Sequence, residues 1–297
     1  MTARVLVPWS DISVPAKLDA VVWDGRGTPP DGLDDVEFYV LPYDQGPAAA
    51  KLIPHLPSLR VVQTLSAGYD NLLPLVPSGV RLANGRGLHD LSVAEHALAL
   101  ILAAQRYFPR WFAQQRTGSW DRVHTRSLAD CRVLLVGYGS IGRAIERYLE
   151  AGEAEVVRVA SAARPGVHGI AELPDLLPTA DIVVLVLPDN PRTRGLFGAA
   201  ELALLPDSAL VVNVGRGTAV DTDALTAEVS AGRLRAALDV VDPEPLPADH
   251  PLWTLDGAII TPHIAGGSDS FYPRAKRLAE RQLAHYAKGE PLENLVN

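Results

Sequence analysis

The sequence predicts an α/β protein of two units, the second of which is a doubly wound parallel sheet. From Cys131 onward, short aliphatic strands alternate with helical segments, as in a parallel sheet with helices on both faces. A G-x-G-x-x-G run stands between one of these strands and the helix that follows it. The first ninety or so residues carry strand and turn patterns of their own, which indicate a separate, smaller α/β unit.

The smaller unit is expected to contain strands separated by turns rich in proline, glycine and aspartate. The strands are expected at residues 5–7, 20–23, 38–41, 59–63 and 80–83, with a short helix at 47–53. The turn Ser66-Ala67-Gly68 follows the fourth strand, and its small residues leave backbone N–H groups exposed that would suit a carboxylate. Most such turns bind nothing, so this turn alone does not identify a site.

A long apolar helix is expected over residues 91–105, with Ser92 as N-cap and Glu95 as its capping-box partner. Its wide apolar face indicates burial against another domain or another subunit. Residues 107–126, which carry Trp111 and Trp120, show no clear period. We interpret them either as an arm over a surface or as a crossover linker.

The second unit is expected to hold its strands at residues 133–136, 156–160, 182–187, 209–214, 235–239 and 258–260. Helices are expected between most of them, for instance over residues 140–149 and 222–231. The last helix, over residues 270–287, ends at Gly289 with Pro291 beyond it. Because it follows the final strand, it can return to the first unit.

The glycine run Gly137-Tyr138-Gly139-Ser140-Ile141-Gly142 follows the uncharged strand at residues 133–136. The first glycine allows a tight turn, the second lets a pyrophosphate approach the backbone, and the third lets the helix pack closely on the strand. The free N–H groups and the dipole at the start of the helix would hold the phosphates. The run therefore predicts a dinucleotide site, and a tight glycine turn without a ligand is the alternative.

Composition excludes several classes of protein. The formal net charge of −8 argues against nucleic-acid or anionic-membrane partners, although it leaves room for a small anionic substrate. The single cysteine, Cys131, cannot form an internal disulfide and is expected to be a buried apolar residue in a reducing compartment. We find no signal peptide and no apolar run of about eighteen residues that would cross a membrane. No metal site is predicted, and the expected location is cytoplasmic.

Three polar residues stand at the ends of strands in the second unit. Arg216 lies between two glycines, Glu244 between two prolines, and His263 follows the last strand. Each could be an ordinary loop residue. Together they supply a proton carrier, an acid that orients it and a cation for an anionic substrate. Beside a dinucleotide, this set predicts hydride transfer coupled to proton transfer at a carbonyl.

With these residues in place, the sequence resembles the D-isomer-specific 2-hydroxyacid dehydrogenases, which include glyoxylate/hydroxypyruvate reductases, D-lactate dehydrogenases and phosphoglycerate dehydrogenases. The resemblance covers nearly the whole chain. Besides the glycine run, it is carried in order by Ser66-Ala67-Gly68-Tyr69-Asp70, Val93-Ala94-Glu95, Leu187-Pro188, Thr193-Arg194-Gly195-Leu196, Asn213-Val214-Gly215-Arg216-Gly217, Leu238-Asp239-Val240, Glu244-Pro245 and Thr261-Pro262-His263-Ile264.

The resemblance implies a role for each matching residue. His263 would exchange a proton with the substrate oxygen, and Glu244 would hold its imidazole and favour the charged form. Arg216 would bind the substrate carboxylate together with the backbone N–H groups of Ala67 and Gly68. The implied cofactor-binding residues are those of the glycine run, from Gly137 to Gly142, with Leu187, Pro188, Thr193, Val214, Gly215 and Asp239, the last bonding the nicotinamide carboxamide.

The sequence departs from the NAD pattern at the second strand of the cofactor domain. An acid that would bond the ribose 2′-OH is expected roughly twenty residues past the glycines. Here the strand runs into Ala160-Ser161-Ala162-Ala163-Arg164 without an acid. We therefore expect a preference for NADP(H), with NAD(H) as the alternative, through Ser161 and Arg164 and with Arg158 as a weaker candidate. A permissive pocket with ordinary surface residues is the other interpretation.

A second departure is Val241-Asp242-Pro243, where many relatives carry an aromatic residue and then an acid. It is expected to leave the chemistry intact, because Glu244 keeps its place.

The resemblance also implies the architecture. A Rossmann cofactor domain, residues 92–268, is expected to be inserted into a smaller flavodoxin-like substrate domain, residues 1–91 and 269–297. A homodimer joined through residues 91–126 is expected.

The leading functional interpretation is a reductase of small 2-keto acids. A dinucleotide-sensing binding protein or corepressor of the same fold is the main alternative, and the absence of basic tails favours the enzyme. An enzyme acting on an unrelated anion such as phosphite or formate is a third interpretation.

Overall fold

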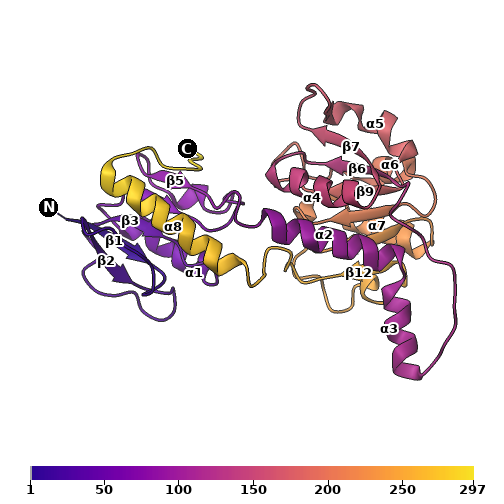
Figure 1. Cartoon of the computed structure of the whole chain (residues 1–297), viewed down its shortest axis with the longest axis horizontal. Coiled ribbons are helices and arrows are strands. Elements are labelled where there is room, and N and C mark those ends of the chain that lie inside the picture. Colours follow the sequence, from indigo (N-terminus) through magenta and orange to yellow (C-terminus); the bar gives the residue numbers. More distant parts are fainter. Residues whose placement is uncertain (1) are drawn as a thin grey trace. The chain divides into compact units, whose positions relative to one another are not determined.

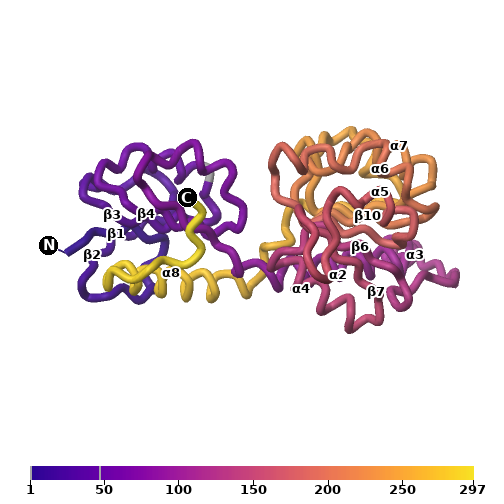
Figure 2. The backbone as a smooth tube through the Cα atoms, turned by 90° about the horizontal axis from the view of Figure 1, so that it is seen from above, coloured from indigo at the N-terminus to yellow at the C-terminus, as the bar shows by residue number. Residues whose placement is uncertain are grey.

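The computed structural model describes residues 2–297, and the chain forms two compact units. The first, here called the split unit, comprises Met1–His89 and Asp269–Asn297, and the second, the inserted unit, comprises Asp90–Ser268. Both ends of the chain therefore belong to the split unit, as the indigo and yellow segments show (Figures 1 and 2). The two boundaries lie between His89 and Asp90 and between Ser268 and Asp269.

The split unit is built on a five-stranded parallel sheet in the order β2-β1-β3-β4-β5, the order of flavodoxin-like folds. Alternate residues of its strands point to opposite faces. Leu6 packs with Ile53 on one face, whereas Val5 packs on the other face against Phe271 and Leu283 of the last helix. The elements are β1 (Ala3–Val7), β2 (Leu18–Val22), β3 (Val36–Val40), α1 (Gly46–Ala49), η1 (Ala50–His55), β4 (Val61–Gln63), η2 (Leu73–Leu75), β5 (Arg81–Ala83) and α8 (Phe271–Lys288).

The inserted unit is built on a seven-stranded parallel sheet in the order β12-β11-β10-β9-β6-β7-β8. The strand order reverses between β6 and β9, which is where such sheets bind dinucleotides. Its strands are β6 (Arg132–Val136), β7 (Glu155–Ala160), β8 (His168–Gly169), β9 (Ile182–Leu185), β10 (Leu210–Asn213), β11 (Arg235–Leu238) and β12 (Ala258–Ile260). With two parallel, doubly wound sheets, the predicted fold class is confirmed.

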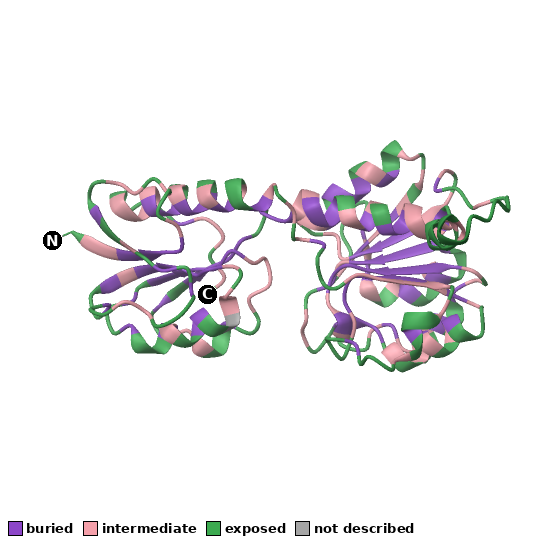
Figure 3. Cartoon of the chain, turned by 90° about the horizontal axis from the view of Figure 1, so that it is seen from below, coloured by how far each residue is buried: buried purple, intermediate pink, exposed green. Residues whose placement is uncertain are grey.

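Helices cover both faces of this sheet. Residues of α2 and α4 pack with Val133 and Leu135 on one face, and residues of α5, α6 and α7 pack with Leu134 and Val136 on the other. Figure 3 shows the buried strands between helices whose outer surfaces are exposed. The helices are α2 (Asp90–Gln105), α3 (Phe108–Thr117), α4 (Ser140–Ala151), α5 (Leu173–Leu176), α6 (Ala199–Leu204) and α7 (Thr222–Ser230), with short turns η3 (Ile170–Glu172), η4 (Leu177–Thr179), η5 (Gly217–Ala219) and η6 (Pro251–Thr254).

The structure differs from the sequence prediction near the start of the inserted unit. The capping box was wrong: α2 begins at Asp90, and Ser92 lies inside the helix with its hydroxyl 2.6 Å from that of Ser268. Glu95 instead accepts a hydrogen bond from Tyr148. The segment with no clear period contains α3, a helix of ten residues without a buried side chain.

Candidate active site

The predicted catalytic residues follow neighbouring strands of the inserted unit. Arg216 lies three residues after β10, Glu244 lies in the loop after β11, and His263 lies in the loop after β12. The glycine turn follows β6 of the same sheet. Because all these strands are parallel, the four features lie at one edge of the sheet, where open α/β folds bind their ligands.

The glycine turn fits a dinucleotide. A Cβ on Gly137, whose φ is +111°, would lie 2.3 Å from the Val186 carbonyl oxygen, and one on Gly142 would lie 2.5 Å from that of Gly137. A Cβ on Gly139 would meet nothing within 4 Å. Close packing of the protein thus requires glycine at residues 137 and 142, whereas Gly139 borders open space at the start of α4. The first N–H groups of that helix have no partner within it and can bind phosphate.

Ser161 and Arg164 are exposed after β7, where a dinucleotide's adenosine ribose would bind. The Arg164 guanidinium donates to the Tyr138 carbonyl oxygen at 3.0 Å and lies 5.9 Å from the centroid of the Tyr138 ring. Among residues 2–297, no carboxylate forms an ion pair with Arg164. Its charge remains available to an anion.

Arg158 is engaged elsewhere. It donates to the buried carboxylate of Glu146, which also accepts from the Tyr138 hydroxyl, and it lies 3.4 Å from Glu150. The hydrogen bond with Glu146 raises the pKa of Arg158. Burial, followed by the same carboxylate, raises the pKa of Tyr138. Glu146 of α4 therefore joins Tyr138 of the glycine turn to Arg158 of β7.

The loops after β9 and β10 approach each other closely beside the glycine turn. A Cβ on Gly215 would lie 2.5 Å from the Leu187 backbone nitrogen. Leu187 and Val214 are buried and Pro188 is exposed. The Thr193 hydroxyl donates to the Pro188 carbonyl oxygen at 2.6 Å, so it closes its own loop, and its predicted contact with the cofactor stays a prediction.

His263 and Glu244 form the central pair. The distance from His263 Nδ1 to Glu244 Oε1 is 2.5 Å, and both side chains remain nearly half exposed. An ionised carboxylate only accepts hydrogen bonds, so Nδ1 carries a proton and Nε2 is the ring atom that faces other partners. His263 has a φ of +51°, a left-handed conformation that is uncommon for a residue with a side chain.

Arg216 is half-buried and stands in an extended backbone conformation directly before η5. Its guanidinium donates to the Gly215 carbonyl oxygen at 2.8 Å, and its own carbonyl oxygen accepts from the Asn213 side chain at 2.9 Å. Asn213 thereby fixes the turn that carries Arg216. No carboxylate of the described residues forms an ion pair with this arginine.

Asp239 is 2% exposed and lies at the end of β11. Its carboxylate accepts hydrogen bonds from the Thr261 hydroxyl and from the backbone N–H groups of Ile264 and Ala265, and it lies 3.4 Å from His96. Burial alone would raise its pKa, but these donors outweigh burial and lower the pKa to about 2. Its predicted bond to the nicotinamide carboxamide stays a prediction.

His96 was not singled out by the sequence reasoning. It directly follows the motif Val93-Ala94-Glu95. Its hydrogen-bond partner Thr261 lies far along the chain, so no local sequence pattern indicated the contact.

In the split unit, Ala67 and Gly68 lie in the turn after β4. The Asn84 side chain donates to the Ala67 carbonyl oxygen at 2.8 Å and holds the turn. Within the described part of the chain, no group accepts a hydrogen bond from the N–H of either residue. A cavity of about 170 Å³, lined by Tyr43, Ser66 and Gly68 among others, lies at this edge of the sheet. These N–H groups are open to an acceptor, and their predicted contact with the substrate carboxylate stays a prediction.

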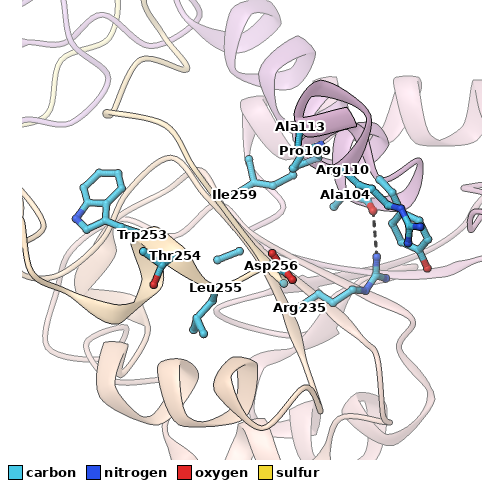
Figure 4. Close-up of a pocket in the computed structure, with 13 residues that line it drawn as sticks. Ala104, Pro109, Arg110, Ala113, Arg235, Trp253, Thr254, Leu255, Asp256 and Ile259 are labelled. Carbon is cyan, nitrogen blue, oxygen red and sulfur yellow. Dashed lines mark hydrogen bonds between the residues drawn. The ribbon is translucent and has the colours of Figure 1, made fainter. Parts of the chain in front are cut away.

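A larger cavity, of about 640 Å³, lies away from the residues described above (Figure 4). It is lined by α3, by the segment before β12 and by Arg235, whose guanidinium is 3.4 Å from the Ala104 carbonyl oxygen. None of the predicted site residues lines it. No group of three or more His, Cys, Asp or Glu side chains within residues 2–297 could hold a metal ion.

Comparison with known proteins decides the family. The sequence profile described as "D-isomer specific 2-hydroxyacid dehydrogenase, NAD binding domain" matches residues 98–265. The chain belongs to the D-isomer-specific 2-hydroxyacid dehydrogenase family. The resemblance carried by the motifs is thereby confirmed, and the inserted unit is the NAD-binding domain of a family whose named members are oxidoreductases.

Among its relatives in the family, the glyoxylate reductase of Aeropyrum pernix is 32% identical over 308 residues, covering 94% of this chain and 90% of the relative. The D-3-phosphoglycerate dehydrogenase of Methanocaldococcus jannaschii is 32% identical over 250 residues, covering 80% of this chain. The chain spans about half of the length of that relative, 48%.

A solved structure gives the same fold. The NADPH-dependent glyoxylate/hydroxypyruvate reductase of Sinorhizobium meliloti, in complex with NADP and sulfate, has a TM-score of 0.84 and 26% identity, covering 99% of this chain and 98% of that one. Within residues 2–297, no helix has the length and apolar character needed to span a bilayer.

Proposed function

We propose that the chain catalyses hydride transfer between NADPH and a small 2-keto acid of the glyoxylate or hydroxypyruvate type. The observation that carries the proposal is the 2.5 Å contact between His263 and Glu244, at the sheet edge that also holds the glycine turn. The names of the Aeropyrum pernix and Sinorhizobium meliloti relatives support this substrate class. A bound nicotinamide dinucleotide supplies the hydride or accepts it.

The residues of the chain then have distinct tasks. Glu244 accepts a hydrogen bond from the Nδ1–H of His263, so Nε2 gives a proton to the keto oxygen in reduction and takes it from the hydroxyl in oxidation. Arg216 binds the substrate carboxylate, for which its planar guanidinium offers parallel N–H donors. In the split unit, the N–H groups of Ala67 and Gly68 bind the same type of group.

The test is the loss of NADPH absorbance with glyoxylate, hydroxypyruvate, pyruvate and phenylpyruvate, and the reverse reaction with D-3-phosphoglycerate. His263→Ala should lower kcat by about a hundredfold or more, because it removes the proton carrier. His55→Ala, a change at an exposed histidine of the split unit, is the matched control. If no 2-keto acid is reduced while the dinucleotide binds tightly, the proposal fails and a dinucleotide sensor or corepressor is the better description.

The preference for NADPH rests on Arg164 and Ser161. A 2′-phosphate is repelled by the acid that NAD enzymes place here, and this chain has no acid at residues 160–164. None of the carboxylates in residues 2–297 pairs with Arg164, whereas Arg158 is neutralised by Glu146. Arg164 is therefore the cation that would bind the 2′-phosphate.

Arg164→Ala should lower the ratio of kcat/KM with NADPH to that with NADH by about tenfold or more, since it removes a charge-assisted hydrogen bond. Arg147→Ala, at an exposed arginine of α4, is the control and should leave the ratio unchanged. Comparable kcat/KM for the two cofactors in the unchanged protein, or an unaltered ratio in Arg164→Ala, would contradict the assignment.

We also propose a homodimer joined through residues 91–126. In this segment α3 has no buried residue, and Phe112 and Trp120 are 56% and 89% exposed. Exposed aromatic residues of this size are typical of protein interfaces. The cavity beside α3 offers a second copy a concave surface (Figure 4). Light scattering should give the mass of a dimer, and Phe112→Ser with Trp120→Ser should give that of a monomer; a monomer in the unchanged protein would refute the proposal.

A further inference from the structure

The loop that carries His263 is wrapped around a single carboxylate. Asp239 accepts the Ile264 N–H and the Ala265 N–H, both at 2.9 Å, and the Thr261 hydroxyl at 2.6 Å. The backbone oxygen of Asp239 accepts the N–H of His263 itself at 2.8 Å. These four bonds hold the loop on both sides of the left-handed residue His263.

His96 lies behind this arrangement, on α2. Its Nε2 is 2.9 Å from the Thr261 hydroxyl oxygen and 3.4 Å from an Asp239 oxygen. Because the Thr261 hydroxyl donates its proton to Asp239, its oxygen can only accept from His96, so Nε2 carries a proton. His96 thus donates a hydrogen bond to Thr261, which in turn donates to Asp239, the carboxylate that holds the loop.

The backbone of His96 is firmly fixed. Its neighbours Ala94 and Ala97 are fully buried, and so is Ile101 one turn further along. They belong to the core cluster that includes Val133, Leu135 and Ala265, the last being a residue of the catalytic loop. Ser92, one turn before His96, is 2.6 Å from Ser268 and ties α2 to the chain just beyond the loop.

We propose that His96 is a positioning residue for the proposed reaction: it orients Thr261 and Asp239, and through them it holds residues 261–265 so that His263 meets Glu244. His96 does not touch the reacting atoms. Its contribution is to keep an uncommon backbone conformation in a loop that is exposed on one side. The inference rests on the proposed function for its catalytic readout, but its structural readout does not.

The experiment compares His96→Ala with His96→Gln, which keeps an N–H donor at similar reach. His96→Ala should lower kcat for glyoxylate about ten- to hundredfold, because small displacements of a catalytic group have effects of this size. KM and the dissociation constant of NADPH should change less than about threefold, since Asp239 is the only expected binding residue that His96 contacts. His96→Gln should recover most of kcat. His55→Ala, the matched control, should behave as the unchanged protein.

Amide hydrogen exchange gives a readout that needs no activity. In His96→Ala, exchange at Ile264 and Ala265 should become faster while that of β6 stays the same, and His96→Gln should restore the protection. A kcat within twofold of the unchanged protein would overturn the proposal. So would unaltered exchange at Ile264 and Ala265. If the unchanged protein reduces no 2-keto acid, the proposed function fails, and the exchange measurement alone decides the role of His96.

Discussion

Replacing Asp239 with asparagine removes one buried charge from the cluster that holds the catalytic loop. The change is nearly isosteric, so it creates no cavity. An amide oxygen in the place of Oδ1 can still accept from the Thr261 hydroxyl and from the Ile264 N–H. The new amide nitrogen, however, is a donor and cannot accept the second backbone N–H, which is left without a partner.

The magnitude follows from the pKa of Asp239, which is lowered from 3.8 to about 2 in the folded protein. Since the folded-state pKa is the lower one, the carboxylate stabilises the fold above its unfolded-state value and loses this contribution as the pH falls through about 2. The difference corresponds to roughly 2 kcal/mol at neutral pH. With a buried N–H left unpaired, we expect a total loss of about 2–3 kcal/mol.

Calorimetry measures this loss directly. For a unit of this size, about 2–3 kcal/mol corresponds to a decrease in Tm of roughly 5–10 °C at pH 7. The difference in Tm between the two proteins should shrink as the pH is lowered from about 5 toward 3, because protonation of Asp239 removes its contribution to the stability of the unchanged protein. Asp249→Asn, at an exposed aspartate, should change nothing. A shift of less than about 1 °C at pH 7, or a difference independent of pH, would refute the reasoning.

Further predictions concern packing and reactivity. Gly142→Ala should cost about 1–3 kcal/mol in unfolding experiments, because its Cβ would lie 2.5 Å from a backbone oxygen. Gly139→Ala should leave stability nearly unchanged but weaken NADPH binding by about tenfold or more in titration calorimetry, because the new methyl group occupies the open space. Leu283→Ala, at a fully buried position of α8, should cost about 2–5 kcal/mol in urea unfolding. Burial, followed by the charge of Asp181, raises the pKa of Cys131, so iodoacetamide should label it more slowly than free cysteine at about pH 8, as followed by mass spectrometry.

Local sequence was sufficient for much of the fold. The run Val133-Leu134-Leu135-Val136 is aliphatic throughout because both faces of β6 are covered, and this is the pattern that predicted a buried parallel strand. The spacing of the glycines could likewise be interpreted, because backbone contacts at Gly137 and Gly142 exclude any side chain. β8 was missed because a strand of two residues has no periodicity.

Contacts between distant residues could not be predicted in this way. The local sequence predicts Ser92 as an N-cap. In the structure α2 begins at Asp90, and the Ser92 hydroxyl forms a hydrogen bond with that of Ser268. The sequence made Arg158 a weaker candidate than Arg164. It could not show that Arg158 forms an ion pair with Glu146, because this contact depends on how α4 packs on β7. The cluster of His96, Thr261 and Asp239 joins three separate segments, and only the folded chain brings them together.

The order of elements along the chain has a consequence for biosynthesis. The sheet of the split unit leaves the ribosome first, but α8, whose Phe271 and Leu283 cover one of its faces, follows only after residues 90–268. We expect the inserted unit to become resistant to protease during translation while the earlier segment stays open to chaperones. In protease digestion of stalled nascent chains ending near residue 268, residues 90–268 should be protected and residues 1–89 cleaved, whereas full-length chains should protect both. Protection of residues 1–89 in the stalled chains would contradict this expectation.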